Sequence, residues 1–186
     1  TIMIPSGSIS TVIENTVATI TFSHPASNSF PSALLKHLTN ELNTVDQNPE
    51  VAIIVLKSEG NTTFCAGASF DELLSLSTLE EGTKFFSGFA NVINAMRNCS
   101  KLIIGRIQGK AVGGGVGLAA ACDYTFATQN SMIKLSEIAV GIGPFVIEPA
   151  VSRKMGKMAF AEMTLTPTEW KSASWAKENH LFSEVF

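Results

Sequence analysis

An uninterrupted apolar run, Val51–Leu56 (VAIIVL), offers no polar side chain to either of the two faces that a β-strand presents. Strands of this kind are typical of parallel sheets that helices cover on both faces. A second apolar run, Leu102–Ile107, is a further candidate for such a buried strand. The two runs predict a parallel sheet inside an α/β fold.

The rest of the chain alternates between strand and helix patterns. Ser8–Ile13 and Val17–Phe22 are β-rich and predict a hairpin. Apolar residues at helical spacing predict a helix over 34–45, with Ser29 or Ser32 as its N-cap and a stop at Asn48-Pro49. Further along, apolar residues at helical spacing predict a helix over Phe85–Met96, and two strands are predicted at Asp123–Thr128 and Met132–Leu135. Two more helices are predicted near Val146–Met155 and Thr168–Asn179, with Thr166 as the cap of the second. The last predicted strand is Leu181–Phe186. This alternation defines the class as α/β.

Composition excludes several classes of protein. The 186 residues suit one domain, 1–186, and 13 Lys+Arg against 16 Asp+Glu argue against a nucleic-acid partner. No apolar run approaches the roughly 20 residues of a membrane span, and Thr1–Ser10 lacks the pattern of a signal peptide. The three widely spaced cysteines suit reduced thiols, so we expect a cytoplasmic protein with no membrane partner.

Two loops built from small residues are candidates for ligand binding. Cys65–Ala68 lets a ligand approach the backbone, and Gly113–Gly115 opens a helix, where unpaired N–H groups favour negative charge. One backbone N–H from each loop could form an oxyanion hole for a carbonyl or thioester oxygen. The alternative is that these glycines only permit tight packing of a helix on the sheet.

Glu137 is the candidate acid or base, because it follows the apolar strand Met132–Leu135 and precedes the apolar stretch Ile138–Ile142. A carboxylate in apolar surroundings has a raised pKa, which suits proton transfer near neutral pH. The alternative is a helix-capping or solvent-facing acid at the end of a strand.

Three segments in chain order combine these features: FCAGASFDE (Phe64–Glu72), KLIIGRIQGKAVGGG (Lys101–Gly115) and SEIAVGI (Ser136–Ile142). They resemble the F-x-A-G-A-D-(I/L)-x-E, K-P-x-I-A-A-(I/V)-x-G-x-A-x-G-G-G and P-E-x-x-x-G-(I/L) segments of the crotonase (enoyl-CoA hydratase/isomerase) superfamily. Phe22–Asn28 likewise resembles the family's N-x-P-x-x-x-N stretch. The resemblance, which covers nearly the whole chain, implies a crotonase-like spiral of ββα units.

The resemblance also implies a site for an acyl-CoA substrate, with no cofactor beyond coenzyme A itself. The thioester oxygen would lie between the N–H groups of Ala68 and Gly114, and Glu137 would be the catalytic base. Residues implied to contact coenzyme A are Pro25, Ala26, Ala66, Gly67, Ser69 and Phe70. Two departures weaken the predicted contacts at one edge of this site, since Ser69 replaces the usual Asp and Asp71 stands where a basic residue is common.

One carboxylate of the two-carboxylate hydratases is missing. Those enzymes carry a Glu at the position of Gly117 and another at that of Glu137. A single base that shuttles one proton suits movement of a double bond, so enoyl-CoA isomerisation is favoured over hydration. A hydratase that uses Glu148 as its second acid stays open, as does the interpretation of Glu148 as a first-turn helix acid.

Other interpretations of the same residues fit the sequence less well. Gly115-x-Gly117-x-x-Ala120 fits a dinucleotide fingerprint, but it does not follow its strand directly. Cys65 as a nucleophile lacks a partner His, no two His have metal-ligand spacing, and Phe85, Phe86 and Phe89 are expected to be core or pocket wall. A non-catalytic acyl-CoA-binding or scaffold protein is the alternative from a different class.

Length carries one further expectation. Members of the resembled family are longer, and the C-terminal helical segment that builds their trimers has no counterpart here. We therefore expect the core domain alone, with a homo-oligomer as the expected but weakened assembly and exposed apolar surface where those helices would pack.

Overall fold

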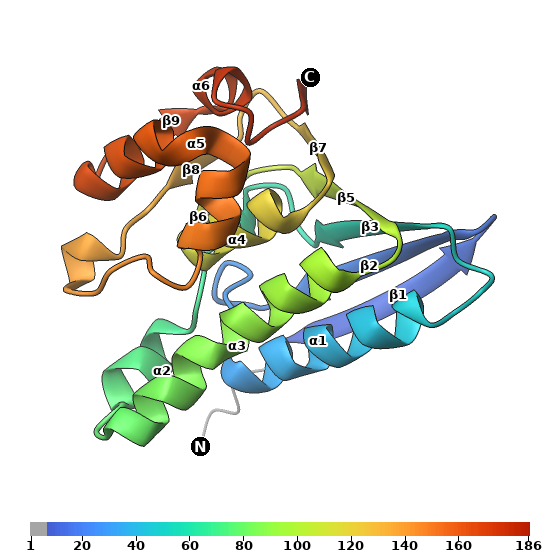
Figure 1. Cartoon of the computed structure of the whole chain (residues 1–186), viewed down its shortest axis with the longest axis horizontal. Helices are drawn as coiled ribbons and strands as arrows, with labels where there is room; N and C mark the ends of the chain where they lie inside the picture. Colours follow the sequence, from blue (N-terminus) through green and yellow to red (C-terminus); the bar gives the residue numbers. More distant parts are fainter. Residues whose placement is uncertain (1–6) are drawn as a thin grey trace.

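The computed structural model describes residues 7–186, and its elements repeat as two strands followed by a helix (Figure 1). In chain order they are β1 (Ser8–Glu14), β2 (Val17–Ser23), α1 (Ser32–Asp46), β3 (Ile53–Ser58), β4 (Thr63–Cys65), α2 (Phe70–Ser75), α3 (Leu79–Asn98), β5 (Leu102–Ile107), β6 (Lys110–Val112), α4 (Gly114–Ala121), β7 (Tyr124–Ala127), β8 (Met132–Lys134), the 3-10 turn η1 (Ile138–Val140), α5 (Glu148–Leu165), β9 (Lys171–Ser172), α6 (Ala173–Glu178) and β10 (Glu184–Val185). This order confirms the predicted spiral of ββα units.

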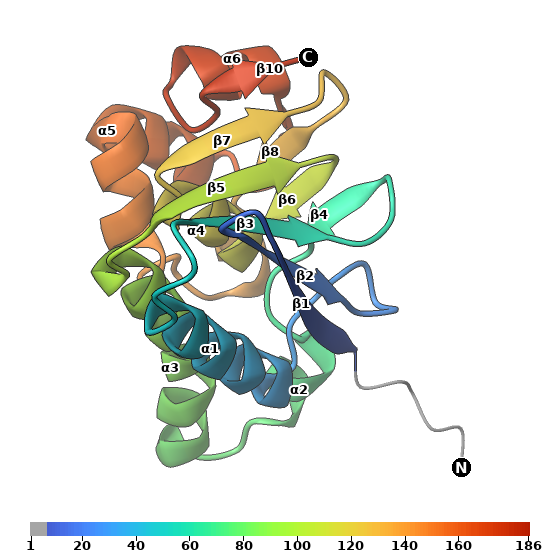
Figure 2. The same cartoon turned by 90° about the vertical axis from the view of Figure 1, so that its right-hand side faces the viewer.

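Successive turns of the spiral build two sheets. The six-stranded sheet has the order β1-β2-β3-β5-β7-β10 and is parallel except for β1. The four-stranded sheet has the order β4-β6-β8-β9 and is parallel except for β9. The three middle turns, β3/β4, β5/β6 and β7/β8, thus place their first strand in the larger sheet and their second strand in the smaller one, which lies behind it in Figure 2. Loops that follow β4, β6 and β8 are therefore brought to one place.

The N-terminal hairpin forms as predicted. Asn15 and Thr16 connect β1 to β2 with φ values of 49° and 68°. Two left-handed residues in a two-residue loop match the right-handed twist of paired strands, and Asn tolerates this conformation well. Residues 1–6, on which the signal-peptide expectation partly rests, lie outside the described residues.

The prediction that Val51–Leu56 is buried on both faces is wrong. Ile54 and Leu56 are fully buried, whereas Ile53 and Val55 on the other face are only partly covered, and Leu102 on the neighbouring strand is 60% exposed. No helix lies in front of β3, β5 and β7 in Figure 2. The apolar run therefore reflects one fully buried face and one face that the described helices leave open.

Two predicted caps and one predicted helix also differ from the structure. Neither Ser29 nor Ser32 caps α1, whose N-cap is Pro31 without a side-chain bond. The predicted helix at 168–179 is the short strand β9 followed by α6, because Lys171 and Ser172 pair with β8. The helix predicted near 146–155 begins at Glu148 and continues, after non-helical backbone at Gly156, to residue 165.

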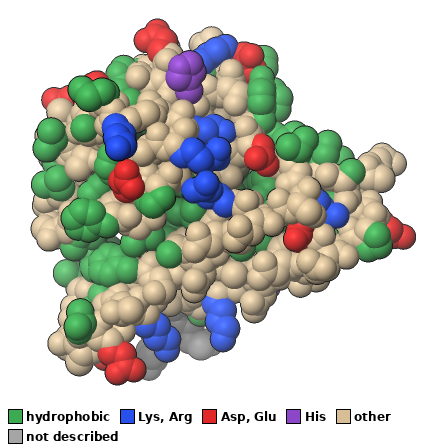
Figure 3. All heavy atoms as spheres, in the orientation of Figure 1, with side chains coloured by type: hydrophobic (Ala, Val, Ile, Leu, Met, Phe, Trp, Pro, Cys, Tyr) green, Lys and Arg blue, Asp and Glu red, His purple; other side chains and the backbone are tan. Residues whose placement is uncertain are grey.

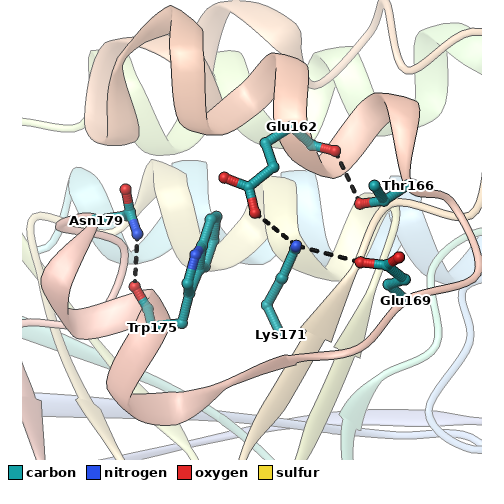
Figure 4. A network of polar contacts seen from close by, with 6 residues as sticks. All are labelled: Glu162, Thr166, Glu169, Lys171, Trp175 and Asn179. Atoms are coloured by element: carbon teal, nitrogen blue, oxygen red, sulfur yellow. Dashed lines mark hydrogen bonds and ion pairs between the residues drawn. The ribbon is translucent and has the colours of Figure 1, made fainter.

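The last turn of the spiral is held by polar contacts around Lys171 (Figure 4). Its ammonium nitrogen lies 2.6 Å from Glu162 Oε1 and 3.5 Å from Glu169 Oε2. Thr166, predicted as the cap of a following helix, instead donates from Oγ1 to the Glu162 carbonyl at the end of α5. Asn179 bonds the Trp175 carbonyl in the same way at the end of α6.

Residues 7–186 show the hydrophobicity of the helices and the state of the three cysteines. None of the described helices has both the length and the hydrophobicity to cross a membrane. Cys65, Cys99 and Cys122 are all free thiols, and the first and last of them are buried.

Candidate active site

A cavity of about 170 Å³ lies where the three sequence segments converge. Its walls come from the loops after β4 and β6, from Glu137 and the stretch that follows η1, and from α2 and α3. The lining residues are Ala66, Gly67, Ala68, Ser69, Phe70, Leu73, Phe85, Phe86, Phe89, Val112, Gly113, Gly114, Ser136, Glu137, Val140, Ile142, Gly143, Pro144, Val146 and Ile147. Most of this wall is apolar, so the cavity suits an apolar group that carries one polar function.

Glycine at position 67 lets the two loops touch. Gly67 has φ +90°, and a Cβ there would lie 2.9 Å from the Val112 carbonyl oxygen and 3.4 Å from the Gly114 nitrogen. Any larger residue would be strained by this backbone conformation and would push the loops apart. The parallel pairing of Cys65 with Ala111 holds β4 and β6 in this relation.

Two N–H groups at this junction are free to bind a ligand. Among residues 7–186, the hydrogen bonds found give no acceptor for the N–H of Ala68 or of Gly114, whereas Ser69 N–H donates to Phe30 O at 3.0 Å. Gly114 is the first residue of α4, where N–H groups have no intrahelical acceptor. One free donor from each loop is the arrangement that an oxyanion requires.

Glu137 provides the carboxylate of the cavity. A Cβ built on Gly113 would lie 2.8 Å from Glu137 Oε1, which places the carboxylate beside the start of α4. Oε2 is buried without a hydrogen-bond partner among the described residues. Burial raises the pKa of Glu137, while a hydrogen bond from its own backbone acts in the opposite direction. Among the described residues that line the cavity, no other has an ionisable side chain.

The glycines of 113–117 divide between the two roles considered from the sequence. Gly113 and Gly114 line the cavity. Gly115 and Gly117 are buried in packing, since a Cβ on Gly115 would lie 2.3 Å from the Cys65 carbonyl oxygen and one on Gly117 would lie 2.6 Å from Ile147 Cγ2. The packing interpretation therefore holds for Gly115 and Gly117, whereas Gly113 and Gly114 stay candidates for ligand binding.

Aromatic side chains from α3 form one wall. Phe85 and Phe86 pack edge to face with ring centroids 5.2 Å apart, and Phe89 lies against the start of α4. This confirms the expectation that they are wall residues. The outer rim is also apolar, because Phe70, Val140 and Phe145 are 54%, 47% and 82% exposed. In Figure 3 hydrophobic side chains gather on the left, where Figure 1 places the η1 loop and α2.

Most of the predicted site residues come together, and three do not line the cavity. Ala66, Gly67, Ala68, Ser69, Phe70, Gly114 and Glu137 all line it. Pro25 and Ala26 lie on an exposed turn that contacts the site loop through Ala66 N–H and the Ser27 carbonyl, at 3.2 Å. Glu148 begins α5 outside the cavity wall, which favours its interpretation as a first-turn helix acid.

The remaining alternatives find no support in the geometry. Burial raises the pKa of the Cys65 thiol to about 12, so this sulfur is not a thiolate nucleophile at neutral pH. Within the described part of the chain, no cluster of His, Cys, Asp and Glu could hold a metal ion.

Sequence reasoning missed part of the wall. Leu73, Gly143, Pro144, Val146 and Ile147 line the cavity, and the predicted site includes none of them. The signal for the last four was their position directly after the Ser136–Ile142 segment.

Comparisons with known proteins agree with the fold and the three segments. The sequence model of the enoyl-CoA hydratase/isomerase family matches residues 12–186. The chain is 30% identical over 160 residues to the peroxisomal Delta(3,5)-Delta(2,4)-dienoyl-CoA isomerase of Arabidopsis thaliana, covering 78% of this chain and 56% of the relative. It is 31% identical over 132 residues to the short-chain-enoyl-CoA hydratase of Clostridium acetobutylicum, covering 70% and 50%.

Solved structures show the same architecture. An enoyl-CoA hydratase from Bacillus anthracis superposes with a TM-score of 0.88 at 26% identity, covering 97% of this chain and 70% of that one. An enoyl-CoA hydratase/isomerase family protein from Silicibacter pomeroyi gives 0.88 at 26%, covering 96% and 76%. The chain belongs to the enoyl-CoA hydratase/isomerase family, within the crotonase superfamily. It spans about half the length of the two curated relatives described above.

Proposed function

We propose that this chain is an enoyl-CoA isomerase that moves a carbon–carbon double bond next to a thioester with a single base. Glu137 takes a proton from the carbon between the thioester carbonyl and a β,γ double bond. The electrons of that C–H bond form a dienolate, whose oxygen accepts hydrogen bonds from the Ala68 and Gly114 N–H groups. The carboxylic acid then returns the proton to the γ carbon, so the double bond ends conjugated to the thioester. No cofactor takes part.

The observation that carries this proposal is the single carboxylate of the cavity. Hydration by two carboxylates needs one group to activate water and a second to manage the proton. Here the position of the second carboxylate is Gly117, and the Ile147 and Ile93 side chains already fill the space beside it. Glu137 alone is adequate for a shuttle that removes and returns one proton.

The energetic requirements of the step fit the geometry. Apolar surroundings raise the pKa of Glu137 and so make it a stronger base once ionised. A developing enolate oxygen is stabilised by donors that need no reorganisation, and loss of one such donor costs about 2.7–4 kcal/mol in comparable sites.

Hydration is the second candidate, because curated relatives at similar identity include hydratases as well as an isomerase. The position of Glu148 outside the cavity wall counts against it as the second acid. A non-catalytic acyl-CoA binder is the third.

One experiment separates the three. The protein is incubated in D₂O with β,γ-unsaturated and α,β-unsaturated acyl-CoA esters, and products are analysed by mass spectrometry and ultraviolet absorbance of the conjugated thioester. An isomerase gives double-bond migration and deuterium at the α and γ carbons without added oxygen. A hydratase gives a β-hydroxyacyl-CoA. Binding of the esters without exchange or product would refute an enzymatic role.

A further inference from the structure

Helix α1 begins with a cap that comes from a distant part of the chain. Its own N-cap, Pro31, has no side chain that can accept a hydrogen bond. The Glu72 carboxylate from α2 takes this role. Its Oε1 and Oε2 accept from the Ser32 backbone N–H at 3.1 and 3.0 Å, and Oε2 accepts from the Ser32 hydroxyl at 2.6 Å. Because a carboxylate and a helix N-terminus attract one another, these bonds are among the stronger kind.

The same two segments are joined again immediately before this cap. Phe30 N–H donates to the Gly67 carbonyl at 2.8 Å, and Ser69 N–H donates to the Phe30 carbonyl at 3.0 Å. These two bonds form a parallel bridge between Phe30 and Ala68. Ala68, with its free N–H, therefore lies in a segment attached to Phe30 on one side and, through Glu72, to Ser32 on the other.

We propose that Glu72 is a positioning residue for the oxyanion hole and acts through Ser32. Its carboxylate holds the segment from Gly67 to α2 against the start of α1, which fixes the direction of the Ala68 N–H and the place of the cavity wall formed by Phe70 and Leu73. This inference rests on the proposed function for its catalytic consequence. A donor displaced by about 1 Å can lower the rate by about 10²-fold, so a modest shift of this segment would be visible in kcat.

A purely structural role for Glu72 is the competing explanation, and the chain offers a matched control. Glu81 caps α3 with similar contacts, accepting from Ser77 N–H at 2.9 Å, Ser77 Oγ at 3.0 Å and Thr78 N–H at 3.1 Å. It does not line the cavity. Loss of either carboxylate removes a helix cap, but only loss of Glu72 releases the Ala68 segment.

A second variant removes the other partner of the contact without breaking the helix. Ser32 is the first residue of α1, where proline is tolerated because its N–H has no intrahelical acceptor. Pro31, at φ −60° and ψ 152°, already has the extended conformation that a residue before proline requires. Ser32→Pro deletes both donors to Glu72, so its effects and those of Glu72→Ala should not add.

The experiment compares wild type, Glu72→Ala, Glu72→Gln, Ser32→Pro, their double variant and Glu81→Ala by hydrogen exchange and by kinetics. We expect Glu72→Ala and Ser32→Pro to speed exchange at the Phe30 and Ser69 amides and to lower kcat by roughly 10- to 100-fold with KM within about threefold. Glu72→Gln, which keeps one acceptor oxygen, should recover part of the slow amide exchange and part of kcat. Glu81→Ala should change neither the exchange at Phe30 and Ser69 nor kcat.

Unchanged exchange at Phe30 and Ser69 in Glu72→Ala, additive effects in the double variant, or equal losses in Glu81→Ala would each overturn the positioning role. If wild type converts no enoyl-CoA ester, the proposed function fails, while the exchange comparison still decides whether Glu72 holds this segment.

Discussion

Replacing Glu137 with glutamine is expected to change activity and stability in opposite directions. The substitution keeps the size of the side chain but removes its charge and its ability to take a proton. A positioned general base contributes about 10²–10⁴ in rate, which is about 3–5 kcal/mol of the barrier. We therefore expect kcat to fall by that factor, with the affinity for coenzyme A esters nearly unchanged because the loop backbones remain in place.

The stability effect follows from burial. Oε2 of Glu137 has no partner among the described residues, and burial raises the pKa of this carboxyl group. Because the folded-state pKa lies above the unfolded value of about 4.3, the folded state binds the proton more tightly and loses stability as the pH rises through the folded pKa. Each unit by which burial raises the pKa corresponds to about 1.4 kcal/mol lost by the ionised form, a loss that a neutral amide at this position does not have. The Glu137→Gln variant, which cannot ionise, should be more stable by about 1 kcal/mol at about pH 8, a Tm increase of about 2–4 °C.

The assay is thermal unfolding and initial rate on the same preparations at about pH 4 and about pH 8. Wild type and variant should unfold at similar temperatures at the lower pH, where most of the carboxyl group is protonated in both states, and diverge at the higher pH. A variant that keeps its rate, or that unfolds at a lower temperature than wild type at about pH 8, would refute the assignment of Glu137 as a buried base.

Two glycine substitutions test the packing of the site. Gly114→Ala should lower kcat and cost about 1–3 kcal/mol of stability, because its Cβ would lie 2.5 Å from Phe89 Cζ. The matched control is Gly82→Ala in α3, whose Cβ would meet nothing within 4 Å. This control should add about 0.5–1 kcal/mol of stability and leave the rate unchanged. Gly117→Glu should destabilise the fold without adding hydratase activity, because its Cβ would lie 2.6 Å from Ile147 Cγ2, and Ile147→Ala should restore part of the lost stability. Thermal unfolding and the two activity assays check both, and a Gly117→Glu protein as stable as wild type would contradict the packing argument.

The site loops were predictable because their signals are local. Residue type and sequence neighbours are sufficient to identify the glycines at 67 and 113–115 and the acid at 137 as candidates. The sequence also shows directly that Gly117 stands where a second carboxylate would be. Parallel pairing of the strands that carry these loops then brings them together without any further information.

Other features depend on tertiary context and left no trace in the sequence. The bond between Glu72 and Ser32 joins residues on different helices, and no local pattern links them. The run at Val51–Leu56 cannot reveal which face of its strand the helices cover. The helix-like stretch around Lys171 becomes a strand because the edge of β8 is available to pair with it, and that contact outweighs local propensity.

The two free N–H groups of the site belong to successive turns of the spiral, and this fixes when the site can exist during folding. The N–H groups of Ala68 and Gly114 become neighbours only after β4 has paired with β6. Parallel strands joined by long crossovers form slowly, because the closure entropy of the connecting chain comes before the contacts that reward it. Helical content should thus return early in refolding, and turnover by the proposed isomerase should return last, when the chain topology is complete.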